Sequence, residues 1–247
     1  MTHQSFSIFG SIRRSRWLIT CDHASNFVPP EINGGDLGIG TANMNRHIAY
    51  DIGAQSTALI LGELLNAPVI CSNFSRLVID PNRGIDDPTL VMHLYDGTII
   101  PANRAVDDKE KKRRIEHYYQ PYHNALAELA SVRDDPIIIA MHSFSPQLIG
   151  RAPRPWEIGV LHAAGGGLLG ISLIKRLRQE HGLTIGDNEP YAGYLPGDSI
   201  DQHALQQNRL NALIELRQDL IETAEGQTQW AQLLATALTD TLKYTKL

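Results

Sequence analysis

Two histidines of this chain stand just beyond apolar, strand-like runs, where they could serve as metal ligands. His142 directly follows residues 136–141, and His23 lies three residues beyond residues 17–20. Continuous apolar runs of this kind indicate strands buried on both faces of a parallel sheet, and ligands bind outside the carboxyl ends of such strands. Because neutral imidazole suits zinc, the pair predicts a metal site built from loops. In the alternative interpretation, His23 caps the turn or helix that follows it.

A catalytic zinc takes three protein ligands and keeps one position open, so a third ligand is needed. His47 and Asp51 are four residues apart near the start of a helical pattern, which places them on one helical face. Either could reach the metal, and Asp51 is the favoured carboxylate. In the alternative interpretation, Asp51 orients His47 or caps a neighbouring turn. Asp22 is disfavoured because adjacent side chains of an extended backbone diverge.

Glu215 lies inside a further apolar, strand-like segment, residues 213–216. Burial of a carboxylate is unfavourable unless the group is paired or functional. One interpretation makes Glu215 a general base that takes a proton from water in a metal site. The other pairs it with Arg217, two residues further along the same face of the strand, as a structural ion pair. The sequence leaves both interpretations open.

Four arginines could bind a negatively charged ligand, because arginine can hold a carboxylate with two parallel hydrogen bonds. Arg76 and Arg83 flank a short predicted strand and an Asp-Pro-Asn turn, and Arg151 and Arg154 come later in the chain. These positions predict an acidic small-molecule substrate. The commoner fate of an isolated arginine is a solvated loop or a local ion pair, which here would join Arg76 to Asp80.

Nucleophilic catalysis by a serine or a cysteine is the competing chemistry. Ser143 and Ser145 lie close to His142, but the chain lacks the Gly-x-Ser-x-Gly turn that exposes a catalytic serine. Cys21 lies two residues from His23, a spacing that needs an unusual loop to form a thiol–imidazole pair. Metal chemistry is therefore the favoured interpretation.

The elements that must position these residues alternate between strands and helices. Strand patterns cover residues 17–20, 68–71, 76–79, 137–141, 158–162 and 213–216, and helical periodicity covers residues 52–66, 107–133, 168–181 and 227–245. Such alternation predicts an α/β fold, with a mostly parallel sheet covered by helices on both faces. No domain boundary is evident, so residues 1–247 are expected to form one domain. Residues 84–104 could form a lid over the site.

Composition excludes several classes of function. The chain has 247 residues, a hydrophobic fraction of 43%, a charged fraction of 20% and a net charge of −5, which are the values of an ordinary soluble globular protein. The negative charge gives no support for binding to nucleic acids or anionic membranes, and no apolar stretch is long enough for a membrane span. Two cysteines and an N-terminal segment without an apolar signal region lead us to expect a cytoplasmic protein.

Seven short motifs carry a further signal. They are Cys-Asp-His-Ala-Ser-Asn at 21–26, Arg-His-Ile-Ala-Tyr-Asp at 46–51, Ser-Arg-Leu-Val-Ile-Asp-Pro-Asn-Arg at 75–83, Pro-Tyr-His at 121–123, Met-His-Ser-Phe at 141–144, Asp-Asn-Glu-Pro-Tyr at 187–191 and Glu-Leu-Arg-Gln-Asp-Leu-Ile at 215–221. In content and order they resemble the N-formylglutamate amidohydrolase family, from about residue 18 to residue 245. The resemblance implies the zinc exopeptidase fold of the zinc carboxypeptidases, a three-layer α/β/α domain with a mixed, mostly parallel sheet.

The resemblance to zinc carboxypeptidases also implies roles for individual residues. Their second metal-binding histidine lies in a segment similar to the one that begins at His142, and their general-base glutamate lies in a Glu-Leu-Arg segment that matches the one at Glu215. Their Asn-Arg pair, which binds the substrate carboxylate, matches Asn82 and Arg83. Arg76 is expected to help stabilise the negative charge that develops on the substrate oxygen.

The first metal motif of the zinc carboxypeptidases, His-x-x-Glu, is only half matched. His23 fits the histidine, but Asn26 takes the place of the glutamate. A neutral amide is a poor substitute for a carboxylate on zinc, so the third ligand is expected from Asp51, with His47 as the alternative. His203 is expected to fill the place of a histidine that many relatives carry in a His-Gly-Glu loop, and so to contact substrate.

The implied reaction is hydrolysis of N-formyl-L-glutamate to formate and L-glutamate, late in histidine breakdown, with zinc or another divalent metal such as cobalt. The expected partner is therefore a small acidic N-acyl amino acid rather than a nucleic acid or a membrane. Two alternatives stay open. One is an amidohydrolase or carboxypeptidase-like enzyme that acts on another N-acyl amino acid or peptide, and the other is a metal-free binding protein with the same fold.

Overall fold

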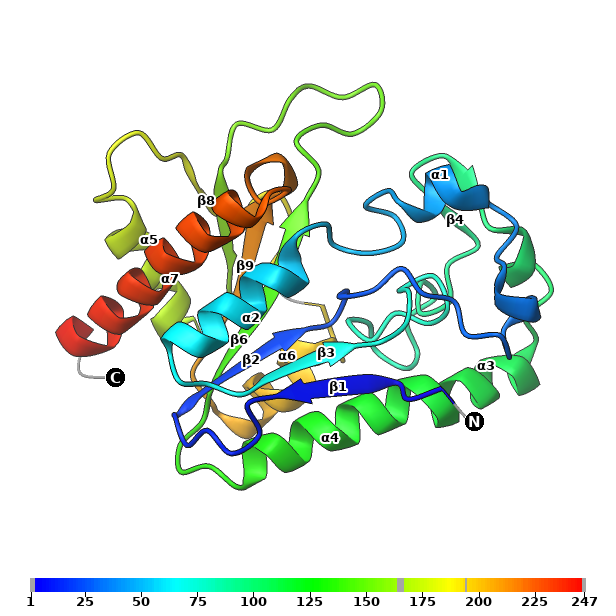
Figure 1. Cartoon of the computed structure of the whole chain (residues 1–247), viewed down its shortest axis with the longest axis horizontal. Coiled ribbons are helices and arrows are strands. Elements are labelled where there is room, and N and C mark those ends of the chain that lie inside the picture. The colour runs from blue at the N-terminus through cyan, green and yellow to red at the C-terminus, as the bar shows by residue number, and fades with distance from the viewer. Residues whose placement is uncertain (1–2, 164–166, 194, 246–247) are drawn as a thin grey trace.

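A computed structural model describes residues 3–163, 167–193 and 195–245, and it has an α/β architecture around one large sheet (Figure 1). Its strands are β1 (Phe6–Phe9), β2 (Trp17–Cys21), β3 (Val69–Ser72), β6 (Ile137–Phe144), β7 (Ile158–Leu161), β8 (Ile185–Asp187) and β9 (Asn211–Arg217). They are arranged in the order β1-β3-β2-β6-β9-β7-β8. The pairs β1–β3 and β7–β9 are antiparallel and the other neighbours are parallel, so the predicted mixed, mostly parallel sheet is confirmed.

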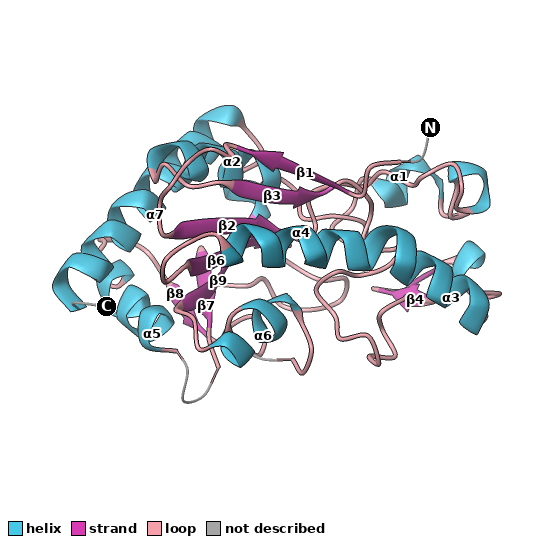
Figure 2. Cartoon of the chain, turned by 90° about the horizontal axis from the view of Figure 1, so that it is seen from below, coloured by secondary structure: helices cyan, strands magenta, loops and turns pink. Residues whose placement is uncertain are grey.

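Helices cover both faces of this sheet (Figure 2). They are α1 (Gly40–Met44), α2 (Ala54–Leu64), α3 (Asp108–Arg114), α4 (Gln120–Ser131), α5 (Leu168–Leu177), α6 (Ser199–His203) and α7 (Ala224–Thr245). A π-helical turn, Ile115–Tyr119, joins α3 to α4, as the continuous pattern at 107–133 predicts. A small hairpin of β4 (Leu94–Tyr95) and β5 (Thr98–Ile99) lies outside the sheet. None of the described helices has the length and apolar character needed to cross a membrane.

Successive strand residues point to opposite faces of the sheet, and helices on each face bury their side chains. In β2, Ile19 packs in the cluster that contains α2, α5 and α7, whereas its neighbour Leu18 packs against α4 through Tyr122 and Leu126. On the α6 side, Ile138 packs with Ile200. The continuous apolar runs of the sequence are therefore explained by burial on both faces.

The carboxyl ends of β2, β6 and β9 bring the candidate metal-binding and catalytic residues together. Trp17 pairs with Ile137 across β2 and β6, and His142 pairs with Glu215 across β6 and β9. Because these three strands are parallel neighbours, the residues at or just beyond their carboxyl ends meet at one edge of the sheet. His23, which follows β2 by two residues, is delivered to the same edge.

The predicted strand at 76–79 is wrong. The segment forms a turn in which Val78 N–H donates to Ser75 O, and Asp80 N–H donates to Leu90 O. Its apolar residues are buried in a second cluster with Ile48, formed by the loops rather than by the sheet. A short apolar run has the same pattern whether it is buried in a strand or in a packed loop.

The prediction that His47 and Asp51 share one face of a helix is also wrong. Residues 46–53 form turns, and α2 begins only at Ala54. Gly53, at φ +77°, adopts a left-handed conformation directly before the helix. Asp51 N–H donates to His23 O at 2.9 Å, so this segment is fixed to the end of β2 instead of continuing the helix.

Gly53 should be far less tolerant of a side chain than Gly182, although both have a left-handed backbone (φ +77° and +80°). A Cβ at Gly53 would lie 2.2 Å from Ile221 O, whereas one at Gly182 would meet nothing within 4 Å. We expect Gly182→Ala to lower the free energy of unfolding by about 1 kcal/mol and Gly53→Ala by about 3 kcal/mol or more. Urea unfolding at an unchanged m value measures both. Equal losses would contradict the packing of Gly53 against Ile221.

Candidate metal and active site

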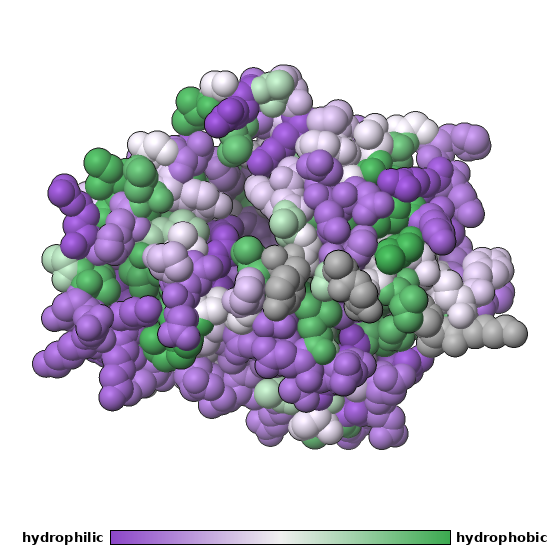
Figure 3. All heavy atoms as spheres, turned by 180° about the vertical axis from the view of Figure 1, so that it is seen from behind, coloured by the Kyte–Doolittle hydropathy of each residue, from purple (hydrophilic) through white to green (hydrophobic). Residues whose placement is uncertain are grey.

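A cavity of about 450 Å³ opens at the carboxyl ends of the central strands. A hollow with hydrophilic walls is visible in the middle of the face drawn in Figure 3. The cavity is lined by most of the candidate site residues, namely His23, His47, Asp51, Arg76, Asn82, Arg83, His142 and Glu215. The rest of its wall includes aromatic and apolar side chains, among them Tyr95, Phe144, Tyr191 and Leu213. One cavity therefore combines polar groups with an apolar surface that can exclude water.

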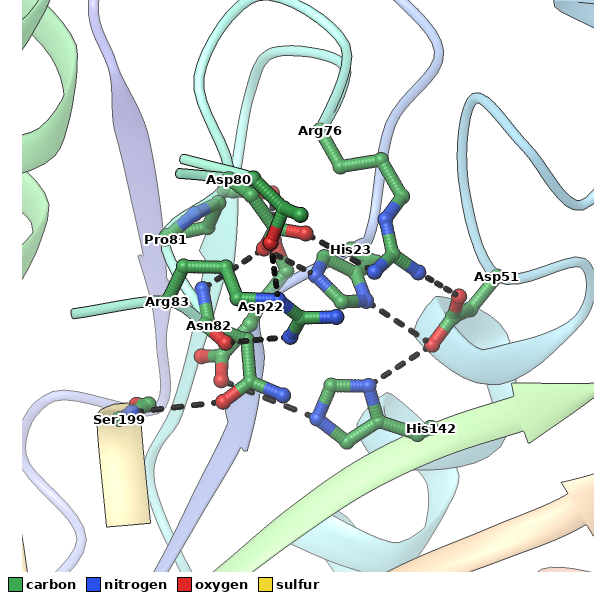
Figure 4. Close-up of polar contacts among 12 residues, drawn as sticks. Asp22, His23, Asp51, Arg76, Asp80, Pro81, Asn82, Arg83, His142 and Ser199 are labelled. Atoms are coloured by element: carbon green, nitrogen blue, oxygen red, sulfur yellow. Dashed lines mark hydrogen bonds and ion pairs between the residues drawn. The ribbon is translucent and has the colours of Figure 1, made fainter. Parts of the chain in front are cut away.

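His23, Asp51 and His142 form, among the described residues, a group that could hold a metal ion (Figure 4). Their candidate ligand atoms all lie within 4.8 Å of one another. Asp51 Oδ2 lies 2.8 Å from His142 Nδ1 and 3.3 Å from His23 Nδ1. All three side chains are buried. Two imidazole nitrogens and one carboxylate oxygen are a donor set that fits zinc and similar divalent cations.

The opposite nitrogen of each histidine faces another carboxylate. His23 Nε2 lies 2.7 Å from Asp80 Oδ1, and His142 Nε2 lies 3.7 Å from Asp22 Oδ2. A carboxylate behind a histidine fixes its tautomer and ring orientation and raises its basicity as a ligand. With Nε2 directed at these acids, both Nδ1 atoms are turned towards Asp51. This is the outer arrangement that metal-binding histidines typically have.

Three buried carboxylates, Asp22, Asp51 and Asp80, surround the two histidines, and Arg76 is the buried arginine that pairs with two of them, Asp51 and Asp80. Burial alone would raise the pKa of Asp51, but His23 and His142 hold it far below its usual range. Burial opposes ionisation of Asp80 as well, yet Arg76 and His23 hold its pKa well below the usual value. Although burial would lower the pKa of His142, the neighbouring carboxylates Asp22 and Asp51 raise it well above the usual value. Such a buried, negative environment attracts positive charge, and a divalent cation fits it.

Arg76 forms the local ion pair with Asp80 that the sequence left open, and it also lines the cavity. Its Nη2 donates to Asp80 Oδ2 at 2.9 Å, which is the predicted local pair, and its Nη1 lies 3.5 Å from Asp51 Oδ1. The guanidinium also lines the cavity, and its Nε has no hydrogen-bond partner among the described residues. Arg76 therefore holds the candidate ligand Asp51 and the outer acid Asp80 in one ion-pair network.

Glu215 is a buried acid for which the described residues supply no ion-pair partner. Its Oε2 makes no hydrogen bond within the described part of the chain. Burial raises its pKa to about 7, against the opposing effect of His142. The alternative pairing with Arg217 is not seen, because Arg217 instead contacts Glu157 at 3.4 Å and Asp219 at 2.8 Å. A carboxyl group whose pKa lies near neutrality, in a cavity, is suited to accept and return a proton.

Asn82 and Arg83 lie beside the candidate metal group. Asn82 Oδ1 accepts a hydrogen bond from Ser199 N–H at 3.3 Å, and Asn82 N–H donates to Asp80 Oδ1 at 2.9 Å. Arg83 donates from Nε to Thr89 Oγ1 at 3.1 Å and from Nη1 to Asn82 O at 2.7 Å. Arg83 has no carboxylate partner within the described residues, so its charge is available to a ligand in the cavity.

Three residues considered in the sequence analysis contact residues other than the candidate metal ligands. His203 is buried against His123, with 2.8 Å between His203 Nε2 and His123 Nδ1, and it is not among the described residues that line the cavity. His47 lines the cavity but faces Asp96, with 3.4 Å between Nε2 and Oδ2. Asn26 donates to Met44 O and Asn45 Oδ1, away from the candidate ligands. His203 therefore lies outside the described lining of the cavity, and its expected contact with substrate stays a prediction.

The competing nucleophiles are occupied by structural contacts. Ser143 Oγ donates to Ile52 O at 2.8 Å, and Cys21 is fully buried opposite Cys71 in the neighbouring strand. Burial and a hydrogen bond to Cys71 raise the pKa of the Cys21 thiol well above its usual value. A cysteine thiol must be deprotonated to attack, so this environment does not suit a nucleophile.

Two contacts were not predicted from the sequence. One is the pairing of Asp80 with His23, and the other is the hydrogen bond from Tyr122 to Asp22. Asp22 accepts a hydrogen bond from Tyr122 OH, which holds its carboxylate beside His142. The signal was present in both cases, because Asp80 lies within the motif at 75–83 and Tyr122 within that at 121–123. Only the fold reveals which atoms these motif residues touch.

An α/β sheet with the buried Glu215 and a candidate metal group in one cavity at its carboxyl edge is an arrangement that suits hydrolysis. The chain belongs to the N-formylglutamate amidohydrolase family, whose model matches residues 15–222. The protein is therefore an amidohydrolase, as the motifs predicted.

Two solved structures are similar over nearly the whole length of both chains. A gene product of Agrobacterium tumefaciens has 29% sequence identity and a TM-score of 0.91, and the alignment covers 99% of this chain and 97% of that one. An N-formylglutamate amidohydrolase from Ralstonia eutropha JMP134 has 22% identity and a TM-score of 0.74, with 98% of each chain covered. The latter likeness supports the fold. No curated protein matches the chain in sequence.

Removal of the acid behind His23 should weaken metal binding without changing the ligands themselves. We expect Asp80→Asn to lower zinc affinity on the order of 10- to 100-fold, because an amide no longer fixes the His23 ring or raises its basicity. Competition with a chromophoric chelator measures the affinity. Asp96→Asn is the matched control, since Asp96 faces His47 outside the ligand group. Equal affinities for wild type and Asp80→Asn would contradict the role of Asp80.

Proposed function

We propose that this amidohydrolase is metal-dependent and cleaves N-acyl acidic amino acids, with N-formyl-L-glutamate as the substrate and formate and L-glutamate as the products. One observation carries the proposal. Glu215, an acid whose Oε2 has no hydrogen-bond partner among the described residues, lies in one cavity with the candidate ligands His23, Asp51 and His142, and with Arg83, which can bind an acidic substrate. Membership of the family supports an amide as the bond that is cleaved.

In this proposal His23, Asp51 and His142 hold a divalent cation such as zinc, or cobalt in its place. The bound cation would supply Lewis acidity, which polarises an amide carbonyl and acidifies water. Asp80 faces Nε2 of His23 and Asp22 faces Nε2 of His142, which keeps both imidazole rings in place. Arg76 holds Asp51 from the other side. The residues thus provide a rigid set of donors before any substrate arrives.

Glu215 acts as the general base and then as the general acid. Its carboxylate takes a proton from water, and the resulting hydroxide adds to the acyl carbon of the substrate. When the C–N bond breaks, Glu215 returns the proton to the leaving nitrogen, so that formate and the free amino group are produced. A pKa raised to about 7 by burial makes both transfers feasible near neutral pH.

Substrate binding is assigned to Arg83, with Asn82 as a second donor. Arg83 has no carboxylate partner within the described residues and lines the cavity, so a substrate carboxylate can pair with its guanidinium. Arg76 is already engaged by Asp51 and Asp80. We therefore propose that Arg76 contributes positive charge next to the developing oxyanion rather than a carboxylate clamp.

A panel of N-acyl amino acids, assayed before and after metal exchange, tests the proposed reaction. We expect the purified protein to hold about one equivalent of divalent metal, to lose turnover on chelation and to recover it with zinc or cobalt. We also expect N-formyl-L-glutamate to have the highest kcat/KM in the panel. A higher kcat/KM for another acyl group would reassign the substrate. Protein that binds no metal and hydrolyses nothing would instead support a binding protein with this fold.

Replacement of the proposed base should abolish turnover while leaving the metal group intact. We expect Glu215→Gln to lower kcat for N-formyl-L-glutamate by about 100- to 10,000-fold, because glutamine cannot accept the proton. Metal content measured by atomic emission should stay at the wild-type level. Glu157→Gln, which removes a nearby acid that pairs with Arg217, is the matched control and should keep normal turnover. Near-normal kcat in Glu215→Gln would show that another group is the base.

A further inference from the structure

Arg154 has no role in the mechanism above, and although it is not among the described residues that line the cavity, it contacts three residues that are. Its guanidinium carbon is 5.6 Å from the ring centre of Phe144 and 5.1 Å from that of Tyr191. Its Nη1 donates to Ser145 O at 3.1 Å and to Tyr191 OH at 3.2 Å, and lies 3.4 Å from Ser145 Oγ. Phe144, Ser145 and Tyr191 all line the cavity. Groups of the cavity wall therefore fix the orientation of this cation.

The guanidinium of Arg154 has no carboxylate partner within the described residues. All the hydrogen bonds that the structure gives it use Nη1, which leaves Nε and Nη2 unused. These two donors form the side of a guanidinium that can bind a carboxylate with two parallel hydrogen bonds. Arg76 and Arg46, by contrast, already have acidic partners in Asp80 and Asp96.

The charge of Arg154 reaches into the cavity. Burial lowers the pKa of His47, a residue of the cavity wall, and the positive charge of Arg154 adds to that lowering. Arg83 is a second arginine of this region without a carboxylate partner in the described chain. Arg83 and Arg154 thus offer two guanidinium groups without carboxylate partners in the described chain, and a ligand with two carboxylates can pair with both.

We propose that Arg154 determines substrate specificity by binding the side-chain carboxylate of an N-acyl glutamate, while Arg83 binds the α-carboxylate. This inference rests on the proposed function, because it assigns the two ends of that substrate. Asn82 beside Arg83 supplies an extra donor for the carboxylate that every N-acyl amino acid carries. Arg154, joined to the hydroxyl of Tyr191, is left for the group that distinguishes glutamate from glutamine.

The test compares N-formyl-L-glutamate with N-formyl-L-glutamine, which has nearly the same shape but lacks the side-chain charge. In the metal-loaded protein we expect Arg154→Gln to lower kcat/KM for the glutamate derivative on the order of 10- to 100-fold, mainly through KM. Turnover of the glutamine derivative should stay nearly unchanged. Arg178→Gln, which replaces an exposed arginine at the end of α5, is the control and should keep the wild-type preference. Arg83→Gln should slow both substrates alike.

Two results would overturn the role of Arg154. One is an equal loss for both substrates in Arg154→Gln, which means that Arg154 only packs the wall, and the other is no loss for either substrate. Failure of the proposed function looks different, because metal-loaded wild type would then hydrolyse neither compound. In that case, calorimetric binding of L-glutamate and L-glutamine still decides the inference. A preference for glutamate that Arg154→Gln loses supports it, and equal behaviour of the two proteins contradicts it.

Discussion

The orientation of two imidazole rings is the constraint on which the rest of the site depends. His23 and His142 come from the ends of neighbouring strands, and each directs Nε2 at a buried acid, Asp80 and Asp22 respectively. Both Nδ1 atoms are thereby turned towards Asp51. A His23 ring rotated by half a turn would offer carbon atoms to Asp51 and leave the buried Asp80 without this donor, which is costly. The outer acids therefore specify the inner donor set.

The surrounding structure supports this arrangement from three directions. Tyr122 of α4 donates to Asp22, Arg76 binds Asp80, and the backbone N–H of Asp51 donates to His23 O. Buried carboxylates persist only where such partners or a cation balance them. Glu215 differs from these acids because no described residue forms an ion pair with it, and its carboxyl group remains able to change protonation state. The same sheet edge thus holds two acids, Asp51 and Asp80, whose lowered pKa keeps them ionised, and a third, Glu215, whose raised pKa lets it gain and lose a proton.

The sequence predicted those parts of the fold and site that follow from strand patterning. His142 and Glu215 could be placed together because parallel strands end at a common edge. Asp51 was selected for its carboxylate, but the helical spacing used to place it is absent, because Gly53 delays the helix. The partner of His23, Asp80, lies in a packed loop whose contacts no periodicity encodes. His203 was placed by motif likeness alone, and the fold directs it to His123 instead.

The most direct test of the central claim is the position of the metal in the zinc-loaded protein. Anomalous diffraction at the zinc absorption edge locates the ion without reference to activity. We expect one strong peak about 2.0–2.2 Å from His23 Nδ1, His142 Nδ1 and a carboxylate oxygen of Asp51. A peak bound through either Nε2 atom, a peak at His47, or no peak between the three residues would contradict this account of the site.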